Sequence, residues 1–278
     1  MKRNGKQTSN GVNRITRTFS DLAEERRAAL MPYYTLGYPD RDTCLEVVKA
    51  VAGAGADLLE LGVPFSDPLA DGPTIQHSTQ VALQSGTTVV SCLEMVAELR
   101  RSGLQQPFLL MGYYNPILSY GVQRFVQAAA RAGADGFIIP DLPIEEAGEM
   151  EDACKAHGLA LIYLLAPTST PERIEKVAAR THGFLYLVSL TGVTGARSSL
   201  PQDLESFVRR VRAHAHSPLA VGFGISTPSQ ARSVAAIADG VIVGSALIQA
   251  VDQANEPAKA AARFTRELYE GLCEQQVL

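Results

Sequence analysis

Tryptophan is absent from the 278-residue chain, and cysteine and histidine are scarce, with four and five residues respectively. None of the cysteines stands in a Cys-x-x-Cys pair and the histidines are scattered, so the sequence offers no spacing typical of metal ligands. We interpret the cysteines as the reduced thiols of a cytoplasmic protein. No apolar run approaches the roughly 18 residues that a membrane helix requires, which argues against a membrane protein.

A large charge of one sign is also missing. The 25 lysines and arginines nearly balance the 29 aspartates and glutamates, which gives a net charge of −4. Because proteins that bind nucleic acid carry a basic surface, this balance argues against nucleic acid as the main partner. Hydrophobic residues make up 46% of the chain, which is enough for a large core and too many for a disordered protein.

The first 17 residues contain five basic side chains, no acidic side chain and no apolar segment. The missing apolar segment excludes a secretory signal. An Arg-rich transit peptide is one interpretation of this composition. We predict instead a disordered polar tail over residues 1–18, followed by one folded domain over residues 19–278.

Short apolar runs recur along the whole chain, and segments with helical spacing, such as 42–54 and 89–101, lie between them. Nearly continuous apolar runs are typical of strands that are buried on both faces of a parallel sheet. Gly55 and Gly133 mark helix ends, and Thr170 and Thr227, each followed by proline, are typical helix N-caps. The eight predicted strands cover residues 29–36, 57–63, 108–113, 136–140, 159–166, 184–189, 219–222 and 240–244.

Eight strands that alternate with helices predict a single-domain (β/α)8 TIM barrel, a fold that typically takes about 250 residues. The alternative is a doubly wound open sheet, but no Gly-x-Gly-x-x-Gly follows the first predicted strand. Residues 19–30 have helical spacing and are predicted to form an extra N-terminal helix that closes the bottom of the barrel. The two longest gaps, 64–86 and 190–200, are predicted loops on the C-terminal face, where barrel active sites lie.

Three side chains are candidates for chemistry. Strand alternation places Glu60 opposite Leu59 and Leu61, inside the barrel, where desolvation would raise its pKa. An internal hydrogen bond or ion pair is the structural alternative for this glutamate. Asp71 lies in a loop stiffened by proline and glycine and could serve only to cap a turn. Tyr186 could bind a substrate or a catalytic carboxylate, or be a core tyrosine.

Glycines at the ends of the last two predicted strands suggest an anion site. Gly222-Phe223-Gly224 follows the seventh strand, and Gly244-Ser245 follows the eighth and opens a helix. Small residues there let backbone N–H groups approach a phosphate at a helix N-terminus, and barrels often bind phosphate at these two loops. Tight turns would require the same glycines for a purely structural reason.

The segment 61–76, Leu-Gly-Val-Pro-Phe-Ser-Asp-Pro-Leu-Ala-Asp-Gly-Pro-Thr-Ile-Gln, resembles the signature of the tryptophan synthase alpha chain family. The resemblance extends from Phe19 to the end of the chain. Tyr33 is a departure, because phenylalanine is common at this position, and so are Leu190 and Thr191. Further matching segments are 113–116 (Tyr-Tyr-Asn-Pro), 140–143 (Pro-Asp-Leu-Pro), 165–168 (Leu-Ala-Pro-Thr), 192–195 (Gly-Val-Thr-Gly) and 222–226 (Gly-Phe-Gly-Ile-Ser).

The resemblance implies a lyase of tryptophan biosynthesis that splits indole-3-glycerol phosphate into indole and glyceraldehyde 3-phosphate by retro-aldol cleavage. Glu60 matches the general acid–base, Asp71 the carboxylate beside the indole N–H, and Tyr186 a tyrosine that packs near the glutamate. Thr194 matches the residue that links the closed loop to the Asp71 side. The implied substrate-binding residues are Tyr33, Met111 and Ile138 for the indole ring, and Gly195, Gly222, Phe223, Gly224, Gly244 and Ser245 for the phosphate.

The family works as an alpha2beta2 heterotetramer, in which the beta chain uses pyridoxal phosphate to join indole to serine. The resemblance implies no cofactor and no metal in this chain, and a beta contact near Pro64, Asp67 and Asn115-Pro116. Three alternatives stay open: a standalone lyase, a binding and activating subunit with little chemistry, and another phosphate-binding barrel such as a sugar-phosphate isomerase. The last would explain the glycines but not the segment 61–76.

Overall fold

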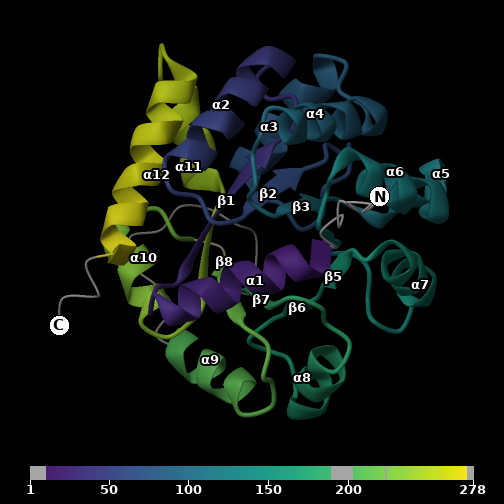
Figure 1. The fold of residues 1–278 in the computed structure, drawn as a ribbon, viewed down its shortest axis with the longest axis vertical. Helices are drawn as coiled ribbons and strands as arrows, with labels where there is room; N and C mark the ends of the chain where they lie inside the picture. The colour runs from purple at the N-terminus through teal and green to yellow at the C-terminus, as the bar shows by residue number, and fades with distance from the viewer. Residues whose placement is uncertain (1–10, 189–202, 223, 274–278) are drawn as a thin grey trace, which may run out of the picture.

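The computed structural model describes residues 11–188, 203–222 and 224–273. At its centre lies a nearly closed barrel of parallel strands in the order β5-β4-β3-β2-β1-β9-β8-β7-β6, surrounded by helices (Figure 1). None of the helices within these ranges is long and apolar enough to cross a membrane. The strands are β1 (Ala29–Thr35), β2 (Leu59–Gly62), β3 (Phe108–Met111), β4 (Gly136–Ile138), β5 (Ala160–Ile162), β6 (Leu164–Leu165), β7 (Leu185–Val188), β8 (Leu219–Gly222) and β9 (Gly240–Val243).

The (β/α)8 prediction is confirmed, with one difference in the fifth strand. Residues 159–166 were expected to form one strand, but they form β5 and β6, separated by Tyr163. β5 pairs with β4 and β6 pairs with β7, and the Tyr163 carbonyl accepts a hydrogen bond from the Tyr186 N–H at 3.0 Å. The two pieces are therefore one barrel strand whose pairing passes from one neighbour to the other.

The helices cover the outside of the barrel, and two of them begin at the predicted N-caps. Thr170 and Thr227 each accept a hydrogen bond from a backbone N–H in the first turn of the following helix, and Gly133 ends a helix with φ of 96°. The helices are α1 (Gly11–Glu24), α2 (Arg41–Gly53), α3 (Pro73–Gln84), α4 (Val89–Arg101), α5 (Tyr114–Tyr120), α6 (Val122–Ala132), α7 (Gly148–His157), α8 (Pro171–Ala178), α9 (Leu204–Arg212), α10 (Pro228–Ala235), α11 (Ser245–Asp252) and α12 (Pro257–Cys273).

The N-terminal helix differs from its prediction at both ends. A helix was expected over 19–30, but α1 runs from Gly11 to Glu24, and Leu30 belongs to β1. The apolar face of α1 begins upstream at Ile15, and the chain reverses at Arg26, whose φ is 55°. Residues 11–18 are therefore helical rather than part of a disordered tail. Residues 1–10 lie outside the described ranges.

As predicted, α1 closes the bottom of the barrel. The Phe19 ring packs against Phe184, just before β7, with the ring centroids 5.5 Å apart. Arg14 and Arg100 both pair with Asp135, whose fully buried side chain also accepts the Phe108 N–H at 2.7 Å. Since Asp135 and Phe108 lie at the starts of β4 and β3, these contacts fix the helix to the N-terminal ends of the strands.

A second correction concerns the segment after β2, which was predicted to be a long loop over 64–86. Its second half is helix α3, which begins at Pro73 and buries Ile75, Ser78, Thr79 and Ala82. The loop proper is shorter, because Pro73 opens a helix whose buried residues recur at helical spacing.

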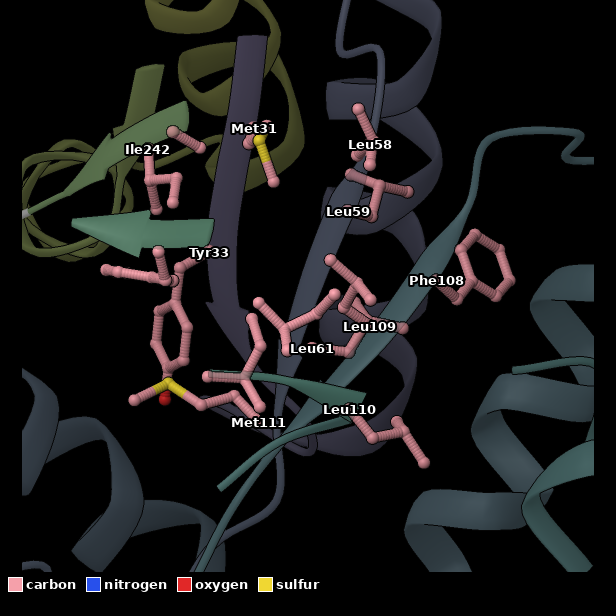
Figure 2. Close-up of a cluster of buried hydrophobic side chains, with 14 of the residues drawn as sticks. Met31, Tyr33, Leu58, Leu59, Leu61, Phe108, Leu109, Leu110, Met111 and Ile242 are labelled. Atoms are coloured by element: carbon pink, nitrogen blue, oxygen red, sulfur yellow. The ribbon is translucent and has the colours of Figure 1, made fainter. Parts of the chain in front are cut away.

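Strand register places alternate side chains inside the barrel. Tyr33 of β1 lies beside Glu60 of β2, and Glu60 lies beside Leu109 of β3. Figure 2 shows Leu109 on one side of β3 and Phe108 on the other, with Phe108 directed outward toward the helices. Glu60 therefore belongs to the interior set, as the sequence predicts.

Candidate active site

Glu60 is a carboxyl group inside the barrel. The residue is 1% exposed, and its Oε2 atom is buried with no hydrogen-bond partner among the described residues. Burial raises the pKa of Glu60 to about 8, and the negative charge of Asp71 contributes to the same rise. A carboxyl group in this setting holds its proton at neutral pH and can donate it to a bound molecule.

Asp71 lies in the loop between β2 and α3 and is also buried. Burial raises its pKa to about 6, and a hydrogen bond from the Tyr113 hydroxyl lowers it. That hydroxyl also accepts the Ala70 N–H at 3.0 Å, so its own proton is available to the carboxylate. Gln76 donates to the Asp71 carbonyl at 2.8 Å. Asp71 is therefore held more firmly than Glu60 and titrates at a lower pH.

Sequence reasoning assigned Tyr113 no role at this site. Its ring packs against Phe65 at a tilt of 36° with centroids 5.5 Å apart, and its hydroxyl hydrogen-bonds two consecutive residues of the loop, Ala70 and Asp71. The available signal was its place directly after β3, on the C-terminal face that carries Asp71.

Two further tyrosines face Glu60 and Asp71, which are called the acid pair below. Tyr33 and Tyr186 are buried, and burial together with the charges of Glu60 and Asp71 raises the pKa of both hydroxyls well above the ordinary value. A side-chain carbon on Gly62 would lie 2.1 Å from the Tyr33 hydroxyl oxygen. These effects place both tyrosines around the acid pair.

The glycines at the strand ends make room for these rings. A side-chain carbon on Gly222 would lie 2.4 Å from the Tyr186 hydroxyl, and one on Gly244 would lie 3.3 Å from the Tyr33 Cβ. Gly222 and Gly244 thus have a steric role that sequence reasoning missed when it assigned them to a phosphate. Both roles are compatible, because the N–H groups of a glycine remain available when its Cα lies against a ring.

The other predicted binding residues fall into three groups. Met111 and Ile138 are register partners at the ends of β3 and β4 and are buried, and Figure 2 shows Met111 and Tyr33 directed toward the same end of the strands. Gly244 precedes α11, which begins at Ser245, and Gly224 has a φ of 82°. Thr194, Gly195 and Phe223 lie outside the described residues.

Over residues 11–188, 203–222 and 224–273, the histidines, cysteines and acidic side chains form no group of three or more that could hold a metal ion. Within the part of the chain that the structure describes, Glu60 and Asp71 therefore belong to no such group. The arrangement is therefore suited to proton transfer by two carboxyl groups that differ in protonation at neutral pH.

The barrel, its two buried carboxyl groups and the glycines at its strand ends are features of a TIM-barrel enzyme. The family model described as "Tryptophan synthase alpha chain" matches residues 19–276. The tryptophan synthase alpha chain of Chloroflexus aggregans is 52% identical over 259 residues, which cover 92% of this chain and 97% of that relative. That of Dehalococcoides mccartyi is 52% identical over 250 residues, covering 90% and 97%.

Solved structures agree with these relatives. The tryptophan synthase subunit alpha of Legionella pneumophila has a TM-score of 0.88 at 39% identity and covers 94% of this chain and 98% of its own. A Mycobacterium tuberculosis tryptophan synthase structure has a TM-score of 0.87 at 40% identity and covers 93% and 98%. The chain belongs to the tryptophan synthase alpha chain family. It is a lyase of tryptophan biosynthesis that acts on indole-3-glycerol phosphate.

Proposed function

We propose that Glu60 and Asp71 carry out the cleavage of indole-3-glycerol phosphate to indole and glyceraldehyde 3-phosphate. The observation that carries the proposal is the contrast between the two buried carboxyl groups. Glu60 has an unpartnered oxygen and a pKa of about 8, whereas Asp71 is hydrogen-bonded by Tyr113 and has a pKa of about 6. Near neutral pH one is an acid and the other an anion, which gives them separate roles.

The reaction needs both states. Neutral Glu60 gives its proton to C3 of the indole ring, and positive charge then develops on the ring nitrogen. The Asp71 carboxylate beside the ring N–H stabilises that charge. The Glu60 carboxylate next takes the proton of the glycerol hydroxyl on the carbon bonded to C3. As the aldehyde forms, the C3–carbon bond breaks and its electron pair returns to the ring, which releases indole and restores neutral Glu60.

The remaining predicted residues would bind the two ends of the substrate. Tyr33, Met111 and Ile138 form the apolar slot for the indole ring, and Tyr186 packs beside Glu60. The phosphate is held by backbone N–H groups at the ends of β8 and β9 and at the start of α11. Those residues are Gly222, Gly224, Gly244 and Ser245, with Gly195 and Phe223 added from the family resemblance. Thr194, by the same resemblance, links the closed loop to the Asp71 side. The barrel, in this proposal, is the single catalytic domain of the chain.

A beta chain is the proposed partner, in an alpha2beta2 complex in the cytoplasm, and pyridoxal phosphate belongs to that beta chain. The predicted contact, near Pro64, Asp67 and Asn115-Pro116, is supported by two exposed apolar side chains. Leu69 in the loop after β2 is 89% exposed and Leu118 of α5 is 50% exposed. The Tyr113 hydroxyl is hydrogen-bonded to this loop, and Tyr113 directly precedes α5. A partner bound at this surface would therefore affect Asp71 through the Tyr113 hydroxyl.

The direct test is an indole-release assay on the purified chain with and without a beta chain. Glu60→Gln is expected to abolish cleavage while leaving substrate binding intact, and undiminished turnover would remove Glu60 from the mechanism.

Strong activation by the beta chain identifies a subunit, and full activity of the chain alone identifies a standalone lyase. An activating subunit without chemistry would release no indole under either condition. Since the chain has no tryptophan, bound indole is followed by its own fluorescence.

A further inference from the structure

A chain of buried hydroxyl groups connects the indole slot to helix α3. The Tyr33 hydroxyl lies 3.3 Å from Thr35 Oγ1, and Thr35 Oγ1 lies 2.7 Å from Ser78 Oγ. Ser78 Oγ in turn donates to the Ile75 carbonyl at 2.9 Å. Thr35 and Ser78 are both 0% exposed, so no water competes for these bonds. Neither residue has a part in the proposed reaction.

The direction of every bond in this chain is fixed by its last member. A carbonyl oxygen only accepts, so Ser78 uses its single proton on Ile75. Thr35 must then donate to Ser78, and the Tyr33 hydroxyl must donate to Thr35. Thr35 therefore accepts from Tyr33 and donates to Ser78, and a side chain without a hydroxyl at position 35 would break both bonds.

The bond to Thr35 holds the far end of a ring that also lies close to the backbone at Gly62 and Gly244. A side-chain carbon on Gly62 would overlap the Tyr33 hydroxyl, and one on Gly244 would press on the near end of the ring. The ring of Tyr33 thus lies between β2 and the end of β9. Its hydroxyl is hydrogen-bonded to Thr35, which belongs to the same strand, β1. A phenylalanine in the same place would keep the flanking contacts but have no hydrogen bond at its tip.

We propose that Thr35 is a positioning residue, which holds the Tyr33 hydroxyl and so fixes the ring that forms one wall of the indole slot. The proposal rests on the proposed function, because it assumes that the slot binds the ring. A wall that is already immobile loses no freedom when indole binds, and this preorganisation improves affinity. Thr35 touches neither the substrate nor the acid pair in this account and acts only through Tyr33.

The test measures the Kd of indole by indole fluorescence and then KM and kcat for cleavage in the full chain. Thr35→Val keeps the shape of the side chain but removes the hydroxyl, and it is expected to raise Kd and KM about fivefold, the effect of one hydrogen bond. The change in kcat should be much smaller. Thr35→Ser keeps the hydroxyl and should restore affinity close to that of the unaltered chain.

Two further variants separate positioning from a general structural effect. In a Tyr33→Phe background, Thr35→Val should cause no additional loss of affinity for indole, because the Tyr33 hydroxyl that Thr35 binds is already absent. Additive losses of affinity would overturn the proposal. Thr265→Val on α12 is the matched control, since Thr265 is equally buried and its Oγ1 atom has no hydrogen-bond partner among the described residues. It should leave Kd unchanged.

The remaining outcomes are also decisive. If Thr35→Val lowers only the melting temperature, or if Thr35→Ser binds indole as poorly as Thr35→Val, Thr35 has no positioning role. If Thr35→Val fails to fold, Tyr33→Phe alone decides, and an unchanged Kd in that variant overturns the proposal. Failure of the unaltered chain to bind indole would overturn both this inference and the proposed function. Binding of indole without any effect of Glu60→Gln on cleavage would overturn only the proposed function.

Discussion

At the scale of single residues, the two carboxyl groups differ more in their hydrogen bonds than in their burial. Both are almost excluded from water, but only Asp71 receives a tyrosine proton. We expect kcat/KM to rise with pH as the carboxyl of pKa about 6 ionises and to fall as the carboxyl of pKa about 8 loses its proton. The two values belong to an interacting pair, so each limb reports the pair as a whole.

Tyr113→Phe removes the hydrogen bond that lowers the pKa of Asp71. The acid limb of the kcat/KM profile should therefore move to higher pH, because more Asp71 stays protonated at a given pH. A pH–rate profile of the variant beside the unaltered chain checks this shift. Tyr120→Phe, which changes a tyrosine of α5 outside the site, is the control and should leave the limb in place. An acid limb that does not move in Tyr113→Phe would contradict the assignment of that limb to Asp71.

Gly222→Ala tests the steric role of the strand-end glycines. The added carbon would lie 2.4 Å from the Tyr186 hydroxyl, so the ring or the strand must shift. We expect a loss of about 1–3 kcal/mol in the free energy of unfolding, as in overpacked cores, and a lower kcat. Gly53→Ala at the end of α2 meets no atom within 4 Å and should be neutral or slightly stabilising. Denaturant titration of both variants is the measurement, and equal stability would refute the overlap.

The placement of a residue could be predicted from sequence where the pattern of one strand sufficed to fix it. Alternation along β2 alone directs Glu60 inward, and the structure agrees. The contacts of Tyr113 with Ala70 and of Thr35 with Ser78 join residues 43 positions apart in each case. No local pattern specifies such pairs, because they depend on how a loop or helix packs on the barrel.

At the scale of secondary-structure elements, predictions succeeded where caps and periodicity agreed. α4 begins and ends where it was expected, after a capping box at Thr88. α3 was missed because its buried positions include Ser78 and Thr79, which sequence reasoning takes for loop residues. The extent of α1 was wrong because its buried face starts at Ile15, within a segment that looks like a polar tail.

Phe19→Ala tests the role of α1 as the closing helix. The ring is 6% exposed and packs against Phe184, so its removal should cost about 3–5 kcal/mol of unfolding free energy. KM and kcat should change little, because the helix lies at the end of the barrel opposite the acid pair. Thr16→Ala, at an exposed position of the same helix, should change stability by no more than about 0.5 kcal/mol. Similar stability of the two variants in denaturant would contradict a closing role for α1.

At the scale of the whole molecule, the acid pair makes stability depend on pH. In the folded chain Glu60 keeps its proton up to a pH of about 8, whereas its ordinary pKa is 4.5. The folded state therefore binds more protons than the unfolded state between these values, and the stabilisation present at low pH is lost as pH rises. Asp71 acts in the same direction between 3.8 and about 6.

Glu60→Gln should remove most of this dependence. In the unaltered chain, we expect the free energy of unfolding to fall as pH rises from about 4.5 to about 8, by an amount on the order of 2–4 kcal/mol. The variant should show a flatter curve and be the more stable protein at pH 8. Urea titrations across this range make the comparison. If the free energy of unfolding varied with pH in the same way in both proteins, Glu60 would not be a buried carboxyl group of raised pKa.

The fit of the Tyr33 hydroxyl over Gly62 has a practical consequence for altering the enzyme. The two positions share one volume, so a larger residue at 62 is tolerable only with a shorter one at 33. A library that varies position 62 alone would return mostly inactive clones. A combined library could reshape the cavity for ring-substituted indoles while the two acids stay in place.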